Sequence, residues 1–175
     1  MKKIGIILIA LIMLVGCKNE SNPQGANNKV ALSDVQQVVE AHLQDDYVAS
    51  MDIDQTQLEE VIGLNMADIE DVIAKQPMMS THVDTFISVK AKTDKANDVE
   101  KILNEYRNFL VESSMQYPGN IAKVNASEVV RHGDYVFFIM LGGFDQRDGV
   151  SEEQQLEFAK NEVAEIKEVI GNFFK

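Results

Sequence analysis

Residues 128–141, EVVRHGDYVFFIML, carry the strongest structural signal in the chain. Glu128 to Arg131 and Asp134 to Leu141 predict two strands, and the His132-Gly133 dipeptide between them suits a tight hairpin turn. A two-residue turn that matches the twist of the strands places glycine at positive φ, which we expect at Gly133. Tyr135 to Leu141 is apolar throughout, so it predicts a central strand buried on both faces.

The segment before this hairpin predicts another strand and a long helix. From Thr81 to Lys92 the pattern has period two, which indicates a strand. One face of that strand carries Val83, Thr85, Ile87, Val89 and Ala91. Thr93 or Asp94 is expected to cap a helix that runs to about Tyr117, where Pro118-Gly119 stops it.

The remaining segments predict four further helices. Ser33 and Gln36 form a capping-box pattern at the start of the first. A loop through Asp52 leads to a short second helix that ends at Gly63. Asn65 is expected to cap the third, with Ile69, Val72 and Ile73 on its apolar face. Ser151 and Gln154 open the last helix, whose apolar residues recur with a period near 3.5 and predict packing onto the sheet rather than a coiled coil.

These elements predict an α+β fold in the order α-α-α-β-α-β-β-α. A strand, a crossover helix and a second strand favour a right-handed parallel connection, and the third strand hairpins back. The third strand is the most apolar, so it is placed between the other two. We therefore predict a three-stranded mixed sheet of order 1-3-2, with the helices mainly on one face, as in half of a ferredoxin-like arrangement.

The first residues predict a secretory signal and a lipid anchor. Lys2 and Lys3 precede an apolar run of 12 residues, Ile4 to Val15. A membrane-spanning helix needs about 20 apolar residues, so this run fits a signal h-region better. Leu14, Val15 and Gly16 then lead into Cys17, which resembles a bacterial lipobox. The Cys17 thiol is expected to receive diacylglycerol after signal peptidase recognises Leu14 to Gly16, and the acyl chains would anchor the chain to the bilayer.

These observations divide the chain into a signal peptide at 1–16, a lipidated cysteine and flexible tether at 17–31, and one folded domain at 32–175. The tether composition, rich in asparagine and poor in aliphatic residues, favours disorder. The predicted location is the extracytoplasmic face of the cell membrane.

Composition excludes several functional classes. Lys+Arg is 16 against Asp+Glu 28, a net charge of -12. Nucleic-acid binding needs cations that displace phosphate counterions, so we expect no nucleic-acid partner. The single cysteine rules out an intrachain disulfide and cysteine clusters for zinc or iron–sulfur.

Several stretches resemble a known family. They are the lipobox, Gly63-Leu64 with Asp68-Ile69-Glu70, the run from Phe86 to Lys92 leading into Asp98-Val99, Tyr117, and the run from Gly133 to Phe137. The chain is similar, from about Leu32 to Lys175, to small cell-surface lipoproteins, mostly of Gram-positive Firmicutes, that carry one domain of unknown function. The resemblance implies a surface lipoprotein and no catalytic residues.

The remaining residues show no catalytic or metal-binding motif, so we predict no catalytic site, no metal and no cofactor beyond the lipid on Cys17. An EF-hand loop starting at Asp52 fails, because Gly63 stands where glutamate is needed. His82 and His132 are expected at opposite ends of the sheet, which excludes a shared metal. Met78-Met79 is interpreted as core or loop packing rather than as a soft metal site.

The expected function is that of a non-enzymatic binding module of the cell envelope, whose partner is an envelope protein or a wall component. Two alternatives stay open, a small solute-binding lipoprotein for a transporter and an envelope hydrolase with an unrecognised site. The candidate contact surface is a sheet face that the helices leave uncovered, where Phe86 and Lys90 of the first predicted strand would lie. That strand is also expected at a sheet edge, where a partner could add a strand. The alternative is that Lys90, Lys92 and Asp84 only keep this edge soluble.

Overall fold

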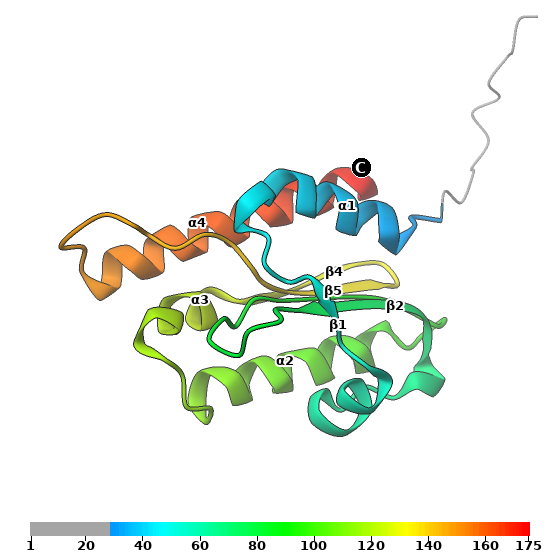
Figure 1. Cartoon of the computed structure of the whole chain (residues 1–175). Helices are drawn as coiled ribbons and strands as arrows, with labels where there is room; N and C mark the ends of the chain where they lie inside the picture. Colours follow the sequence, from blue (N-terminus) through cyan, green and yellow to red (C-terminus); the bar gives the residue numbers. More distant parts are fainter. Residues whose placement is uncertain (1–28) are drawn as a thin grey trace, which may run out of the picture.

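The computed structural model describes residues 29–175, and the predictions on the signal, the lipobox and most of the tether fall outside that range. Figure 1 shows a sheet between two helical layers, with α1 and α4 on one face and α2 on the other. The strands are β1 (Met51–Asp52), β2 (Ile69–Gln76), β3 (Thr85–Ala91), β4 (Glu128–His132) and β5 (Tyr135–Met140). The α-helices are α1 (Leu32–Leu43), α2 (Ala96–Glu112), α3 (Ile121–Ala126) and α4 (Glu152–Gly171). A π-helix, η2, spans Gln57–Ile62, and a 3₁₀ turn, η4, spans Pro118–Asn120.

The five strands form one antiparallel sheet in the order β1-β2-β3-β5-β4. The three predicted strands are β3, β4 and β5, and β5 does lie between the other two. The α+β class and this local order are therefore confirmed. The predicted three-stranded mixed sheet is wrong, because two further strands extend the sheet beyond β3 and every neighbouring pair is antiparallel.

The main error concerns β2, which the sequence pattern predicts as a helix. Ile69, Val72 and Ile73 have helical spacing, but they are also β-branched and suit a strand. The pairing of β2 with β3 along its length satisfies its backbone and selects the strand. Asn65 caps only a 3₁₀ turn, where its side chain accepts from the Ala67 amide.

Both faces of the sheet are buried, which corrects the prediction that the helices lie mainly on one face. On the α2 side, Ile87, Val89 and Phe138 belong to one apolar core. On the α1 and α4 side, Phe86 and Phe137 belong to a second core. The predicted two-sided burial of β5 is confirmed, because its residues alternate between the two cores.

The predicted helix ends are confirmed at Gly63 and at Ser151 but not at Ser33. Ser151 and Gln154 form the predicted capping box of α4. The predicted box at Ser33 is absent, because α1 begins two residues earlier than predicted, with Ala31 rather than Ser33 at its N-cap. Gly63 follows η2 in the left-handed conformation expected of a residue that ends a helix.

Gly133 has a φ of +61° in the β4–β5 turn, as predicted. A side chain there would meet open space, so its cost is backbone strain alone. We expect Gly133→Val to lower the free energy of unfolding by about 1 kcal/mol or more in urea unfolding. Gly119→Val is the matched control, since Gly119 also faces open space but has no positive φ. Equal losses in the two variants would contradict the role of the turn.

Candidate functional site

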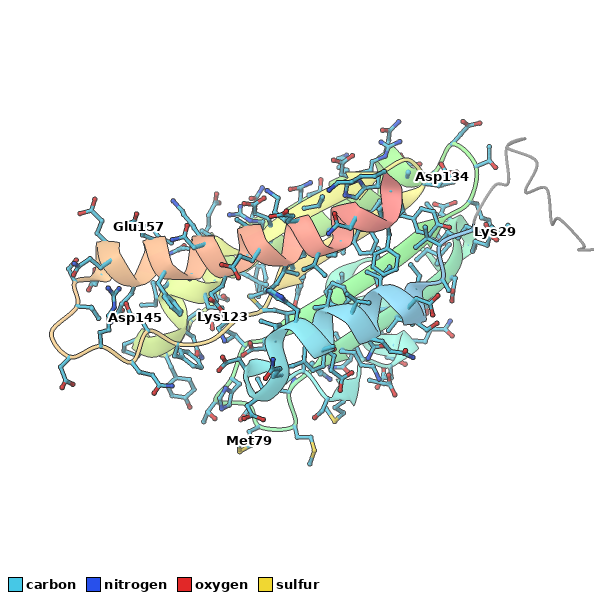
Figure 2. The ribbon with its side chains drawn as sticks, turned by 90° about the horizontal axis from the view of Figure 1, so that it is seen from above. Lys29, Met79, Lys123, Asp134, Asp145 and Glu157 are labelled. Carbon is cyan, nitrogen blue, oxygen red and sulfur yellow. The ribbon has the colours of Figure 1, made fainter. Side chains whose placement is uncertain are left out.

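The two ends of the sheet differ in the side chains and surface features that they carry. At one end Lys29 bonds to Glu70 at 3.1 Å, and Glu70 also bonds to Lys90, which pairs with Tyr135 beside the β4–β5 turn. The opposite end, which we call the distal end, comprises residues 77–84, 113–123 and 142–157. Figure 2 shows Met79, Lys123, Asp145 and Glu157 toward that end and Lys29 and Asp134 at the other. The run of β2 from Glu70 to Gln76 separates the two by about 20 Å.

A buried ion pair lies at the base of the distal end. Asp84 directly precedes β3, and its Oδ1 accepts from Lys123 Nζ on α3 at 2.7 Å. The side chains of Asp84 and Lys123 are 0% and 4% exposed. The Phe144 ring lies over Lys123 Nζ, 4.0 Å from its centroid, which adds a cation–π contact. The pair therefore joins the start of β3, α3 and the loop after β5.

The second carboxylate oxygen of Asp84 faces His82. His82 Nδ1 is 3.9 Å from Asp84 Oδ2, and neither atom has a hydrogen-bond partner among residues 29–175. Burial raises the pKa of the Asp84 carboxyl above its ordinary value, although Lys123 acts in the opposite direction. Because Asp84 has no exposed surface, a substrate cannot reach its carboxylate in this conformation. The arrangement is suited to holding three chain segments together.

The loop after β5 is held by contacts with α4 and by an ion pair within the loop. Gly142 has a φ of +127°, and a Cβ there would lie 2.8 Å from Glu162 Cβ on α4. The Gly143 amide donates to Glu162 Oε2 at 3.0 Å. Arg147 donates to both oxygens of Asp145, at 2.8 and 2.6 Å, and holds the pKa of the Asp145 carboxyl below its ordinary value. Glycine at 142 is required because the backbone approaches α4 too closely for a side chain.

The surface of the distal end is hollowed and partly apolar. A groove of about 570 Å³ runs between the η4–α3 segment and the start of α4. A second hollow of about 340 Å³ is bordered by Met78, Met79 and His82. Met78 and Met79, which border the second hollow, are 78% and 62% exposed, and Met115, next to Gln116 of the same hollow, is 99% exposed. Exposed apolar side chains gathered around hollows are typical of interaction surfaces.

Phe86 and Lys90, the predicted contact surface, lie in the middle of the sheet and not at its edge. β3 lies between β2 and β5, so the predicted edge position is wrong. Phe86 has no exposed surface and stacks on Phe137, with the ring centroids 6.4 Å apart. Lys90 bonds to Glu70 at 2.7 Å, which raises the pKa of Lys90. The error follows from the missed strand β2 and from the cover that α1 and α4 provide.

The histidines lie apart, as predicted for His82 and His132. The strand register places His132 opposite Tyr135, and Tyr135 pairs with Lys90 at the end of β3 farthest from His82. His132 stacks on Phe174 at 4.5 Å, and desolvation lowers the pKa of this imidazole. His42 faces Glu165, with 3.5 Å between Nε2 and Oε2.

Lys123 and Phe144 are site residues that the sequence reasoning missed. Lys123 stands among Ile121, Ala122 and Val124, and Asp84 stands in a predicted strand. A lone charge in an apolar segment is a signal of a buried pair, but it does not identify the partner. Gly133 occupies its predicted turn. The predicted lipid-attachment site and its recognition residues lie outside the described residues; they are Cys17, Leu14, Val15 and Gly16.

Comparison with known proteins places the chain in a family. No curated protein and no solved structure matches it. Within residues 29–175, no helix has both the length and the apolarity needed to cross a bilayer. Residues 43–141 match the model of a domain of unknown function, DUF4358, from the last residue of α1 to the residue after β5. The stretches between Gly63 and Phe137 that resemble the family all lie inside this range, and the match covers more than half of the chain. The chain therefore belongs to the DUF4358 family.

Proposed function

We propose that this chain is a lipoprotein anchored through Cys17 on the extracytoplasmic face of the membrane, and that its domain is a non-enzymatic recognition module. The observation that carries the proposal is the position of the distal end. Lys29, the first described residue, is held at Glu70, whereas the exposed methionines and the hollows lie about 20 Å away at the other end of the sheet. A chain anchored before Lys29 would present the distal end away from the lipid.

Anchoring also supports a binding role on physical grounds. A tethered domain meets envelope partners at a raised local concentration, so weak contacts are sufficient. The acidic composition would repel an anionic lipid surface and hold the domain off the membrane. Asp84 and His82 bring a carboxylate and an imidazole together, but the complete burial of Asp84 argues against their use as a hydrolase site.

The anchor is tested by Cys17→Ala. We expect the variant to lose thioether lipidation and to be released or misprocessed, because no other thiol exists in the chain to accept the lipid. The measurement is incorporation of radiolabelled fatty acid, with membrane fractionation of the same cells. Label that still enters the alanine variant would overturn the anchor.

The recognition role is tested with a photocrosslinking amino acid in place of Met115 on intact cells. Val61 is the matched control position, because it is also an exposed apolar residue, at 65%, but lies on η2. η2 is followed by Gly63, which faces Ile102 in the first half of α2, away from the distal end. We expect a specific crosslinked partner from position 115 and none from position 61. Equal patterns at both positions, or turnover abolished by a single carboxylate or histidine substitution, would overturn the proposal.

A further inference from the structure

The groove between the η4–α3 segment and α4 combines an apolar floor with an acidic rim. Ile121, Ala122 and Leu156 supply aliphatic surface, and Ile121 is 48% exposed. Glu152 and Glu153, in the first turn of α4, line the same groove. None of the described residues that line it is basic.

Nearby cations do not neutralise this rim. Lys123 lies in the adjoining hollow, but it is paired with Asp84 and buried. Arg147 is engaged by Asp145 through two bonds. The start of α4 contributes a partial positive charge of roughly +0.5, which offsets only a fraction of the two formal negative charges. The Ser151–Gln154 capping box also occupies the Ser151 and Gln154 amides at the start of α4, so neither of these two donors is left for an anion.

We propose that this groove binds a segment of a partner protein in which an aliphatic side chain is flanked by lysine or arginine. The aliphatic side chain would cover Ile121 and Leu156, and the flanking cations would face Glu152 and Glu153. The proposal deepens the recognition role given above, because it names the chemistry of the partner at the same distal end.

Other occupants fit these features less well. A second copy of the chain would bring its own net charge of -12 toward an acidic rim. Residues 18–28, KNESNPQGANN, hold no large aliphatic side chain that could cover Ile121. A polyanionic wall polymer would be repelled by Glu152 and Glu153.

The test uses the full chain in zwitterionic lipid nanodiscs and dye-labelled pentapeptides, read by fluorescence anisotropy against empty nanodiscs. The probes are Lys-Lys-Leu-Lys-Lys, the apolar-deleted Lys-Lys-Ser-Lys-Lys, and the charge-reversed Glu-Glu-Leu-Glu-Glu. We expect saturable binding of the first probe, weakened by added salt, and affinities at least about tenfold lower for the other two.

The variants locate the binding. Ile121→Ser and the double variant Glu152→Gln with Glu153→Gln are expected to weaken the first probe by about tenfold or more. The matched controls are Val61→Ser and Glu59→Gln with Glu60→Gln, which change an exposed apolar residue and an exposed acidic pair on η2. The controls are expected to bind as the unaltered chain does, and thermal unfolding of each variant verifies that it is folded.

Each other outcome overturns the inference. Equal losses in the groove and control variants would mean a general charge effect, and absence of binding by the unaltered chain would mean that the groove does not take this chemistry. Preference for the glutamate probe would point to an anionic ligand instead. Because no cell or partner enters this assay, its failure leaves the crosslinking result from position 115 as a separate test of the recognition role.

Discussion

Replacing Asp84 with asparagine is expected to lower the free energy of unfolding by about 3–5 kcal/mol, because it leaves a buried lysine without its counter-ion. Asparagine keeps the size of the side chain, so the change removes the charge and little of the packing. Lys123 is 4% exposed and has Asp84 as its only salt-bridge partner in the described part of the chain. A buried ammonium without a partner either deprotonates or draws water into the core, and both reduce stability.

Urea unfolding at neutral pH measures this loss, with Asp52→Asn as the matched control. Asp52 also pairs with a lysine, Lys75, at 2.6 Å, but its side chain is 81% exposed. Exposed pairs contribute about 0–1 kcal/mol, so the control is expected to change little. A loss at Asp84 no larger than the loss at Asp52 would contradict the structural role of the buried pair.

Replacing the other partner of the pair, in Lys123→Met, distinguishes an effect of charge from an effect of packing, because only the charge effect on stability depends on pH. Burial already raises the pKa of the Asp84 carboxyl, and loss of Lys123 removes the group that opposes this shift. A carboxyl whose pKa is higher in the folded state favours folding below its unfolded pKa, and this contribution is lost as the pH rises through the folded pKa. The deficit of Lys123→Met relative to the unaltered chain is therefore expected to shrink as the pH is lowered from about 7 to about 4. A deficit that stays constant with pH would indicate a packing effect only.

The parts of the fold that the sequence predicts correctly are those governed by local chemistry. The apolar run of β5 can be buried on both faces wherever it lies, so composition alone identifies it as a central strand. Gly133 and the Ser151–Gln154 box depend on neighbours within three residues. These features need no knowledge of distant segments.

The parts that it misses depend on partners far along the chain. Ile69, Val72 and Ile73 fit a helix or a strand, and only pairing with β3 decides between them. Asp84 and Lys123 lie 39 residues apart, so no spacing rule connects them. The period-two pattern of β3 correctly separates its two faces, but the cover over Phe86 comes from α1 and α4, at the two ends of the described chain.

Phe86→Ala is expected to cost about 3–5 kcal/mol of stability, because it empties a fully buried aromatic site. The ring stacks on Phe137 and belongs to the core under α1 and α4. Truncation removes this burial and leaves a cavity that close-packed neighbours fill only in part. Phe109→Ala is the matched control, since Phe109 is 55% exposed on α2, and its expected change is within about 0.5 kcal/mol.

This result decides how partner experiments on the chain are designed. Phe86→Ala can be used in partner experiments only if it is folded. If its urea midpoint is markedly lower, failure of this variant to bind a partner results from unfolding of the domain and not from removal of a contact residue. A midpoint unchanged from that of Phe109→Ala would instead show that the face of β3 toward α1 and α4 tolerates exposure, as a contact surface must. The buried stacking of Phe86 on Phe137 favours the first outcome, so contact variants belong at exposed residues such as Met115 and Ile121, where substitution leaves both cores intact.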